Sequence, residues 1–193
     1  GFVLPVAVDR TVAVVATPRE DNTVRAYSVD FEQHDEFPVD AVRRFLGTKG
    51  GWRDYVRGVA WALADANIAL RGADMAISGD VPRGAGLSSS AAIEVAVAGA
   101  LLAVAGVEMA PRDVALACQK AENLFVGVQC GIMDQFASAL GREGHALLID
   151  CRSLEFDAVP LPAGVSIVVI DSKVERKLGE TAYNRRREEC AEA

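Results

Sequence analysis

The feature that most constrains this chain is a glycine-rich segment that leads directly into an apolar stretch. Residues 79–92 read Gly-Asp-Val-Pro-Arg-Gly-Ala-Gly-Leu-Ser-Ser-Ser-Ala-Ala. Gly84 and Gly86 permit positive φ and a close approach of the backbone to a ligand, which residues with a Cβ resist. Residues 91–104 are nearly all Ala, Val, Leu, Ile and Gly, which predicts a helix buried on most of its surface. The chain therefore presents a glycine loop at the fixed N-terminus of a buried helix.

The three serines of this segment fall where the helix begins. Free N–H groups and the positive end of the helix dipole attract anions at such an end, and serine hydroxyls can cap the helix or reach a metal ion on bound phosphates. No Gly-Lys-Ser/Thr follows the loop, as a P-loop would require, and the glycine spacing differs from that of a dinucleotide fold. The residues alone leave two interpretations open: a phosphate-binding loop, and a serine cap after a flexible turn.

Several segments together resemble the galactokinases, a group within the GHMP small-molecule kinases. The string from Pro82 to Ala91 is similar to the second family motif, Pro-x-Gly-x-Gly-Leu-Ser/Gly-Ser-Ser-Ala. The run Cys-Gly-Ile-Met-Asp-Gln-Phe at 130–136 and the segment 144–155 also resemble galactokinase sequences. The opening Gly-Phe-Val-Leu-Pro resembles the residues that follow the first family motif, Gly-Glu-His-Thr-Asp-Tyr-Asn, which this sequence lacks. The resemblance implies that the chain is the central part of a longer enzyme.

The resemblance also implies roles for particular residues. Asp134 would contact the sugar hydroxyl that accepts the phosphoryl group and act as its base; from the residues alone, a helix N-cap is the alternative. Gly131 would let the backbone approach the sugar, and Tyr183 would hydrogen-bond it. Glu122, twelve residues before Asp134, would bind Mg²⁺ together with Ser90, whereas composition alone suggests an exposed helical glutamate.

The nucleotide-binding set that the resemblance implies consists of the loop and two aromatic residues. Its members are Pro82, Gly84, Ala85, Gly86, Leu87, Ser88, Ser89, Ser90, Ala91, Trp52 and Tyr55. The helical spacing around Trp52 and Tyr55 fits core packing equally well. The cofactors implied by the resemblance are ATP and Mg²⁺.

The rest of the sequence predicts an α+β domain with helices packed on a mixed or antiparallel sheet. The expected elements are an antiparallel hairpin around residues 18–22, helices at 52–66, 91–104, 111–125 and 134–140, and strands at 75–78, 146–150 and 166–171. The resemblance implies the fold of the N-terminal domain of GHMP kinases, called ribosomal protein S5 domain 2-like. We expect one such domain over 1–193, with the start of a C-terminal domain at about 172–193.

Charge and cysteine content limit the kinds of partner and the cellular location that we expect for this protein. The 193 residues carry 20 Lys and Arg against 27 Asp and Glu, a net charge of −7, and no long basic run, which argues against a nucleic-acid partner. The four cysteines lack a Cys-x-x-Cys spacing, so neither a zinc site nor a redox pair is predicted. They are typical of a reducing cytoplasm. No signal peptide or apolar run of membrane-spanning length is recognised, so we expect no membrane partner and a cytoplasmic location.

Taken with the resemblance, these observations predict an MgATP-dependent kinase that phosphorylates the anomeric hydroxyl of α-D-galactose in the Leloir pathway. The alternatives are another GHMP kinase, acting on N-acetylgalactosamine, mevalonate or homoserine, and a non-catalytic sensor of galactose and ATP. The intact Ser88–Ser90 favours catalysis. We expect the full enzyme to be a monomer, and the chain by itself to be inactive and to self-associate through an exposed strand edge.

Overall fold

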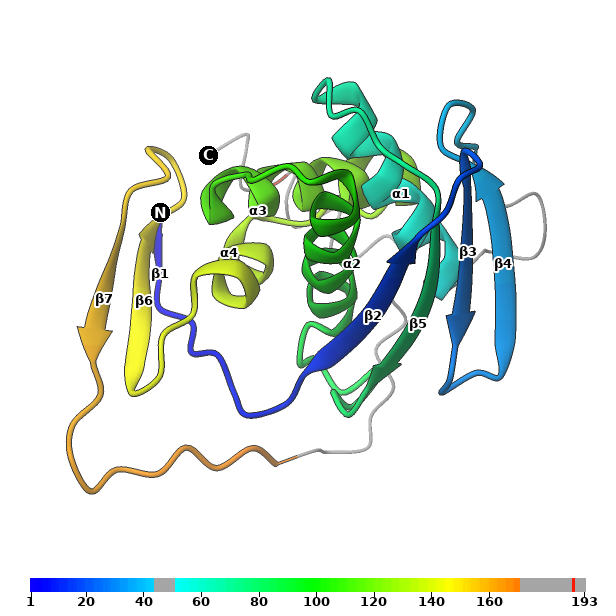
Figure 1. Cartoon of the computed structure of the whole chain (residues 1–193). Coiled ribbons are helices and arrows are strands. Elements are labelled where there is room, and N and C mark those ends of the chain that lie inside the picture. Colours follow the sequence, from blue (N-terminus) through cyan, green and yellow to red (C-terminus); the bar gives the residue numbers. More distant parts are fainter. Residues whose placement is uncertain (44–50, 171–188, 190–193) are drawn as a thin grey trace.

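Two β-sheets lie on either side of a layer of helices (Figure 1). The structure, a computed structural model, describes residues 1–43, 51–170 and 189. In chain order the elements are β1 (Phe2–Val3), β2 (Val12–Pro18), β3 (Thr23–Ser28), β4 (Gln33–Pro38), α1 (Trp52–Asp65), β5 (Ala73–Gly79), α2 (Ser89–Ala105), α3 (Pro111–Lys120), η1 (Ala121–Val126, a π-helix), α4 (Met133–Leu140), β6 (His145–Asp150) and β7 (Phe156–Pro160). This arrangement confirms the predicted α+β fold.

The larger sheet is mixed and has the strand order β2-β5-β3-β4. β5 pairs antiparallel with β2 along its whole length and parallel with β3. The predicted hairpin of β2 and β3 is therefore wrong, because β5 lies between these two strands. The chain leaves β3 through β4 and α1 before it returns as β5, and a parallel pair of strands needs a long crossover connection of this kind.

Gly72 explains how β5 enters between two strands that a short turn connects. The Arg19 amide donates to the Gly72 carbonyl (2.9 Å), so the start of β5 lies against the turn that joins β2 to β3. A Cβ on Gly72 would lie 1.9 Å from the Asp21 carbonyl oxygen. A residue without a side chain is therefore required where β5 passes this turn.

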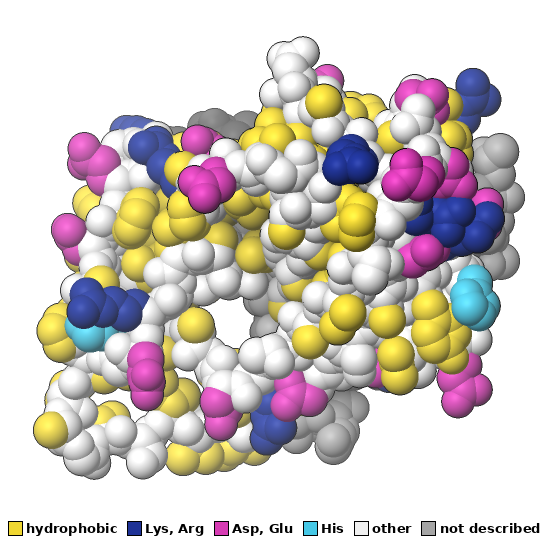
Figure 2. Space-filling model, viewed as in Figure 1, with side chains coloured by type: hydrophobic (Ala, Val, Ile, Leu, Met, Phe, Trp, Pro, Cys, Tyr) yellow, Lys and Arg dark blue, Asp and Glu magenta, His cyan; other side chains and the backbone are white. Residues whose placement is uncertain are grey.

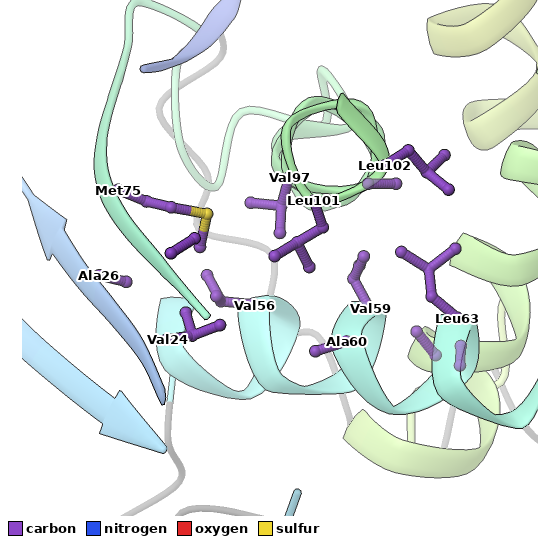
Figure 3. Close-up of a cluster of buried hydrophobic side chains, with 14 of the residues drawn as sticks. Val24, Ala26, Val56, Val59, Ala60, Leu63, Met75, Val97, Leu101 and Leu102 are labelled. Atoms are coloured by element: carbon purple, nitrogen blue, oxygen red, sulfur yellow. The ribbon is translucent and has the colours of Figure 1, made fainter. Parts of the chain in front are cut away.

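The main hydrophobic core lies between the larger sheet and helices α1 and α2 (Figure 3). Buried residues recur along α1 at helical spacing, at Val56, Val59 and Leu63, as expected for one apolar face of a helix. They pack in one cluster with Val97 and Leu101 of α2. Full burial of such side chains stabilises a fold by about 1.5–3 kcal/mol each, so this core fixes the position of α2 and of the loop that precedes it.

A second, smaller core joins the other sheet to the helices. This sheet has the order β1-β6-β7 and is antiparallel. Phe136 of α4 is fully buried there with Leu147 and Ile149 of β6, and its ring meets that of Phe156 edge to face, with 5.9 Å between centroids. The core fixes the orientation of α4, which carries Asp134 in its first turn.

Two predicted elements differ from the structure. The helix expected at 111–125 becomes a π-helix after Lys120, because the Gly127 amide donates to the Glu122 carbonyl five residues earlier (2.9 Å). The strand expected at 166–171 does not form over its described residues, 166–170, because no other described strand pairs with them. Their apolar side chains are exposed, and Figure 2 shows hydrophobic side chains along the lower edge, where this segment runs in Figure 1.

Two further predictions concern the domain boundary and membrane-spanning helices. The boundary expected at about 172–193 lies outside the described residues apart from Glu189. Within the described part of the chain, no helix is both long and apolar enough to cross a membrane.

Candidate active site

The glycine-rich loop has a left-handed backbone conformation at three alternate positions. Gly84, Gly86 and Ser88 have φ values of 73°, 77° and 56°. Left-handed residues in alternation with ordinary ones turn successive N–H groups toward one side, which forms a concave site for anions. Ser88 is the N-cap of α2, yet its side chain makes no capping hydrogen bond. The serine-cap interpretation therefore does not account for Ser88, which instead holds a strained conformation of the kind that clusters at functional sites.

The loop and α4 line the same cavity, which has a volume of about 760 Å³. Its walls come from the N-terminal segment, the loop, the start of α2 and the first turns of α4, and include Gly86, Leu87, Ser88, Met133, Asp134 and Ser138. The face of the molecule shown in Figure 2 is hollowed beside the N-terminal segment. Asp134 and the loop are far apart in sequence, and the fold brings them to one cavity of the size that small-molecule sites have.

Asp134 is half-buried in the first turn of α4, after the N-cap residue Ile132. The alternative interpretation of Asp134 as a helix N-cap is therefore wrong. The positive end of the α4 dipole favours a negative charge at this position. A carboxylate placed in this way can accept a hydrogen bond from a hydroxyl group bound in the cavity.

Glu122 is buried, with 4% of its surface exposed, which contradicts the interpretation as a solvated helical glutamate. Its Oε2 accepts hydrogen bonds from Gln135 Nε2 (2.7 Å) and Cys130 Sγ (3.2 Å). Burial raises the pKa of Glu122, while hydrogen bonds from Cys130, Ser90 and Gln135 oppose that shift. The Ser90 hydroxyl lowers the pKa of Glu122, so the predicted metal-binding pair is close together in the fold.

The chemistry of this pair fits Mg²⁺. A hydroxyl and a carboxylate are hard oxygen donors, and Mg²⁺ in nucleotide sites commonly has one or two protein ligands besides phosphates and water. The described residues contain no group of three or more His, Cys, Asp or Glu placed to hold a metal ion. A bound cation would also compensate the charge of the buried Glu122 carboxylate.

Two residues of the site escaped the sequence analysis, Glu94 of α2 and Gln135 of α4. Both are completely buried, and Gln135 Nε2 donates to Glu94 Oε2 (3.2 Å). Burial raises the pKa of Glu94 well above its usual range, and the nearby charge of Glu122 adds to this shift against the hydrogen bond from Gln135. A sequence signal existed, because Glu94 is the one charged residue within the apolar stretch 91–104.

The two aromatic residues expected in the adenine pocket lie in different surroundings. Trp52 is buried in the main core, and its Nε1 donates to Gln33 Oε1 (3.3 Å). Tyr55 is half-buried, and its pKa is raised by burial and then by the charges of Glu122 and Glu94. Tyr55 therefore lies near the buried acidic residues.

The structure separates some of the other predicted site residues from the main cavity. Gly131 is exposed, with open space where a Cβ would be. Pro82 and Ala85 line a neighbouring cavity of about 650 Å³, and Leu87 borders both cavities. Ser89 begins α2 and Ala91 is buried in its first turn. Tyr183 lies outside the described residues.

Comparison with known proteins agrees with this geometry. Residues 54–142 match the GHMP kinases N terminal domain. The chain is 52% identical over 98% of its length to the galactokinase of Roseiflexus sp., covering 48% of that protein. It is 49% identical over its whole length to the galactokinase of Chloroflexus aggregans, covering 49% of it. The chain thus spans about half the length of these curated relatives.

Among solved structures, the Lactococcus lactis galactokinase complexed with galactose superposes with a TM-score of 0.87 and 31% identity, covering 100% of this chain and 50% of the other. A mevalonate kinase structure matches with a TM-score of 0.66 at 16% identity, which shows a shared fold alone. Residues 54–142 thus match the N-terminal domain of the GHMP kinases. The chain is similar over its whole length to galactokinases, as its motifs predicted.

Proposed function

We propose that this chain carries the nucleotide loop and the sugar-facing carboxylate of a galactokinase. The reaction is transfer of the γ-phosphoryl group of MgATP to the anomeric hydroxyl of α-D-galactose, which gives galactose 1-phosphate and ADP. The observation that carries the proposal is the convergence of Asp134 and the loop residues Gly86–Ser88 on one cavity. This convergence occurs in a chain that matches a galactose-bound galactokinase along its entire length.

Each group has a role that follows from its position. Loop amides and the N-terminus of α2 bind the phosphates, and Asp134 orients the sugar hydroxyl and accepts its proton. The hydroxyl oxygen then bonds to the γ-phosphorus as the bond between that phosphorus and the ADP oxygen breaks. Ser90 and Glu122 would hold Mg²⁺, which when bound neutralises charge on the β- and γ-phosphates. Phosphoryl transfer depends mainly on such positioning and charge compensation.

The proposal extends to partners and location. Galactose and ATP are the ligands, no nucleic acid or membrane is involved, and the full enzyme acts as a monomer in the cytoplasm. The described cysteines, Cys118, Cys130 and Cys151, are free thiols, which is compatible with a reducing compartment.

The test is an acceptor screen with the full-length protein. Release of ADP is measured with MgATP and galactose, N-acetylgalactosamine, mevalonate or homoserine, and the product is identified by phosphorus NMR. We expect turnover with galactose and phosphate on its anomeric carbon. Turnover with one of the other acceptors alone would assign a different GHMP kinase activity, and galactose and ATP binding without turnover would indicate a sensor.

A further inference from the structure

Asp134 and Gln135 are adjacent in α4, but they lie in different surroundings. Asp134 lines the main cavity, whereas Gln135 is fully buried between α2 and the π-helix. The predicted reaction uses Asp134, Glu122 and the loop serines, and assigns no task to Gln135 or to Glu94. These two are nevertheless among the largest fully buried polar side chains described.

The Gln135 amide joins the elements that carry the predicted functional groups. Its Nε2 donates to Glu122 Oε2 (2.7 Å) and to Glu94 Oε2 (3.2 Å). Glu94 lies one helical turn after Ser90 on α2, and Glu122 lies on the π-helix. One nitrogen therefore links three elements, α2, η1 and α4.

We propose that Gln135 and Glu94 are positioning residues, which hold the Glu122 carboxylate at Ser90 and fix the first turn of α4 against α2. Glutamine suits this place because its amide is neutral and offers two N–H donors on one atom. A carboxylate here would repel the charge of Glu122, and an apolar side chain would donate no hydrogen bond. Without the hydrogen bond from Gln135, the flexible Glu122 side chain would lose a charge-assisted contact that selects one rotamer.

The state of Glu94 supports this assignment. Glu94 Oε1 and Gln135 Oε1 are buried and have no hydrogen-bond partner among the described residues. Burial without a partner is costly for an ionised carboxylate and much less so for a neutral acid. A neutral Glu94 still accepts from Gln135 through Oε2 and adds no second charge next to Glu122.

The inference rests on the proposed function, and its test uses a readout that is independent of turnover. Mn²⁺ is added to the full-length protein with ADP, and free Mn²⁺ is measured by its EPR signal. Gln135→Met keeps the length of the side chain and removes both donors. We expect its Mn²⁺ dissociation constant to rise by about 10- to 100-fold, as is usual when a residue that orients a metal ligand is lost. The kcat with galactose should fall as well, with a smaller change in the galactose KM.

Three further variants separate positioning from loss of structure. Glu94→Leu removes the acceptor for Gln135 and should weaken Mn²⁺ binding in the same direction. Glu94→Gln keeps a neutral group with an acceptor oxygen and should restore affinity close to that of the wild type. Gln119→Met is the matched control, because the described bond of Gln119 goes to the Cys130 carbonyl and to neither glutamate.

The outcomes decide between the two proposals. Unchanged Mn²⁺ affinity and kcat in folded Gln135→Met and Glu94→Leu proteins, judged by thermal unfolding, would overturn the positioning role while galactose turnover by the wild type stands. Weakened Mn²⁺ binding in a protein that does not phosphorylate galactose would support the positioning role and refute the proposed substrate. If Gln135→Met does not fold, the contrast between Glu94→Leu and Glu94→Gln decides the question.

Discussion

Glu94 and Glu122 are two buried acids in one cluster that differ in their hydrogen bonds. Both pKa values are raised by burial, but the carboxylate of Glu122 accepts hydrogen bonds from Gln135 and Cys130, whereas that of Glu94 accepts one, from Gln135. Hydrogen bonds to a carboxylate stabilise its charged form. Hydrogen bonding therefore opposes the rise in pKa more strongly at Glu122 than at Glu94.

This difference predicts how stability depends on pH. The folded-state pKa of Glu94 is raised above its unfolded value, so its contribution to stability is complete below that unfolded value, about 4.3. The contribution is lost as the pH rises through the folded-state pKa. Glu94→Gln removes this loss, and its urea midpoint relative to the wild type should increase from about pH 5 to about pH 8.

The measurement is urea unfolding of both proteins across that range, with Glu108→Gln as the control because Glu108 is exposed. Glu122 and the Gln135 amide remain beside position 94 in both proteins, so the difference isolates the ionisation of residue 94. Parallel pH profiles of wild type and Glu94→Gln would show that Glu94 does not stay neutral in the folded state.

Asp134→Asn tests the proposed base. The change preserves shape but removes the proton acceptor, and general-base groups contribute about 10²- to 10⁴-fold to rates. We expect kcat with galactose to fall by that factor while calorimetry shows nearly unchanged ATP affinity. Asp113→Asn is a matched control, because Asp113 also lies in the first turn of a helix and outside the cavity. More than about a tenth of the wild-type kcat in Asp134→Asn would remove Asp134 from the chemistry.

At the scale of the elements, the sequence predicted the helices well and the strand partners poorly. The predicted helices at 52–66 and 91–104 agree with α1 and α2 within a few residues, because hydrophobic periodicity is a local signal. The position of β5 between β2 and β3 depends on a long crossover, which no local pattern records. The glycine at position 72 is required by this arrangement, but its close approach to Asp21 is seen only in the folded structure.

The same limit applies to the candidate site. The motifs predict roles for Asp134, Glu122 and the loop, but none for Gln135, although it belongs to the same run as Asp134. The side chain of Gln135 matters because of its partners on two other elements. A residue whose role consists of bridging distant segments has no signature of its own in a single sequence.

Gly72→Ala tests the insertion of β5. Its Cβ would meet backbone atoms, which cannot move aside as a flexible side chain can. Overpacking of this kind costs about 1–3 kcal/mol or more, so we expect a clear fall in the free energy of unfolding. Gly99→Ala is the control, because its Cβ would point into open space on α2, where alanine should stabilise by up to about 1 kcal/mol. Equal stability of the two variants would contradict the arrangement of the turn.

At the scale of the whole molecule, the helical layer is anchored by two separate cores, one for each sheet. Phe136→Ala opens a cavity in the smaller core and should destabilise the protein by about 3–5 kcal/mol. The rate of amide hydrogen exchange should then increase more in β6 and β7 than in β3 and β5. Phe2→Ala is the control, because Phe2 is 73% exposed and surface changes cost little. A uniform rise in exchange across both sheets would mean that the cores act as one.

The π-helix at Ala121–Val126 has a consequence for the length of the chain. Glu122 and Asp134 are separated by a fixed number of residues, part of which is taken up by the wider π turn. Each residue of an α-helix adds a rotation of about 100°, so deletion of one residue here would change the direction in which the chain leaves Glu122 toward α4. The exposed Leu124 could be replaced by many side chains, but not omitted. In this segment the fold constrains the number of residues more strictly than the identity of their side chains.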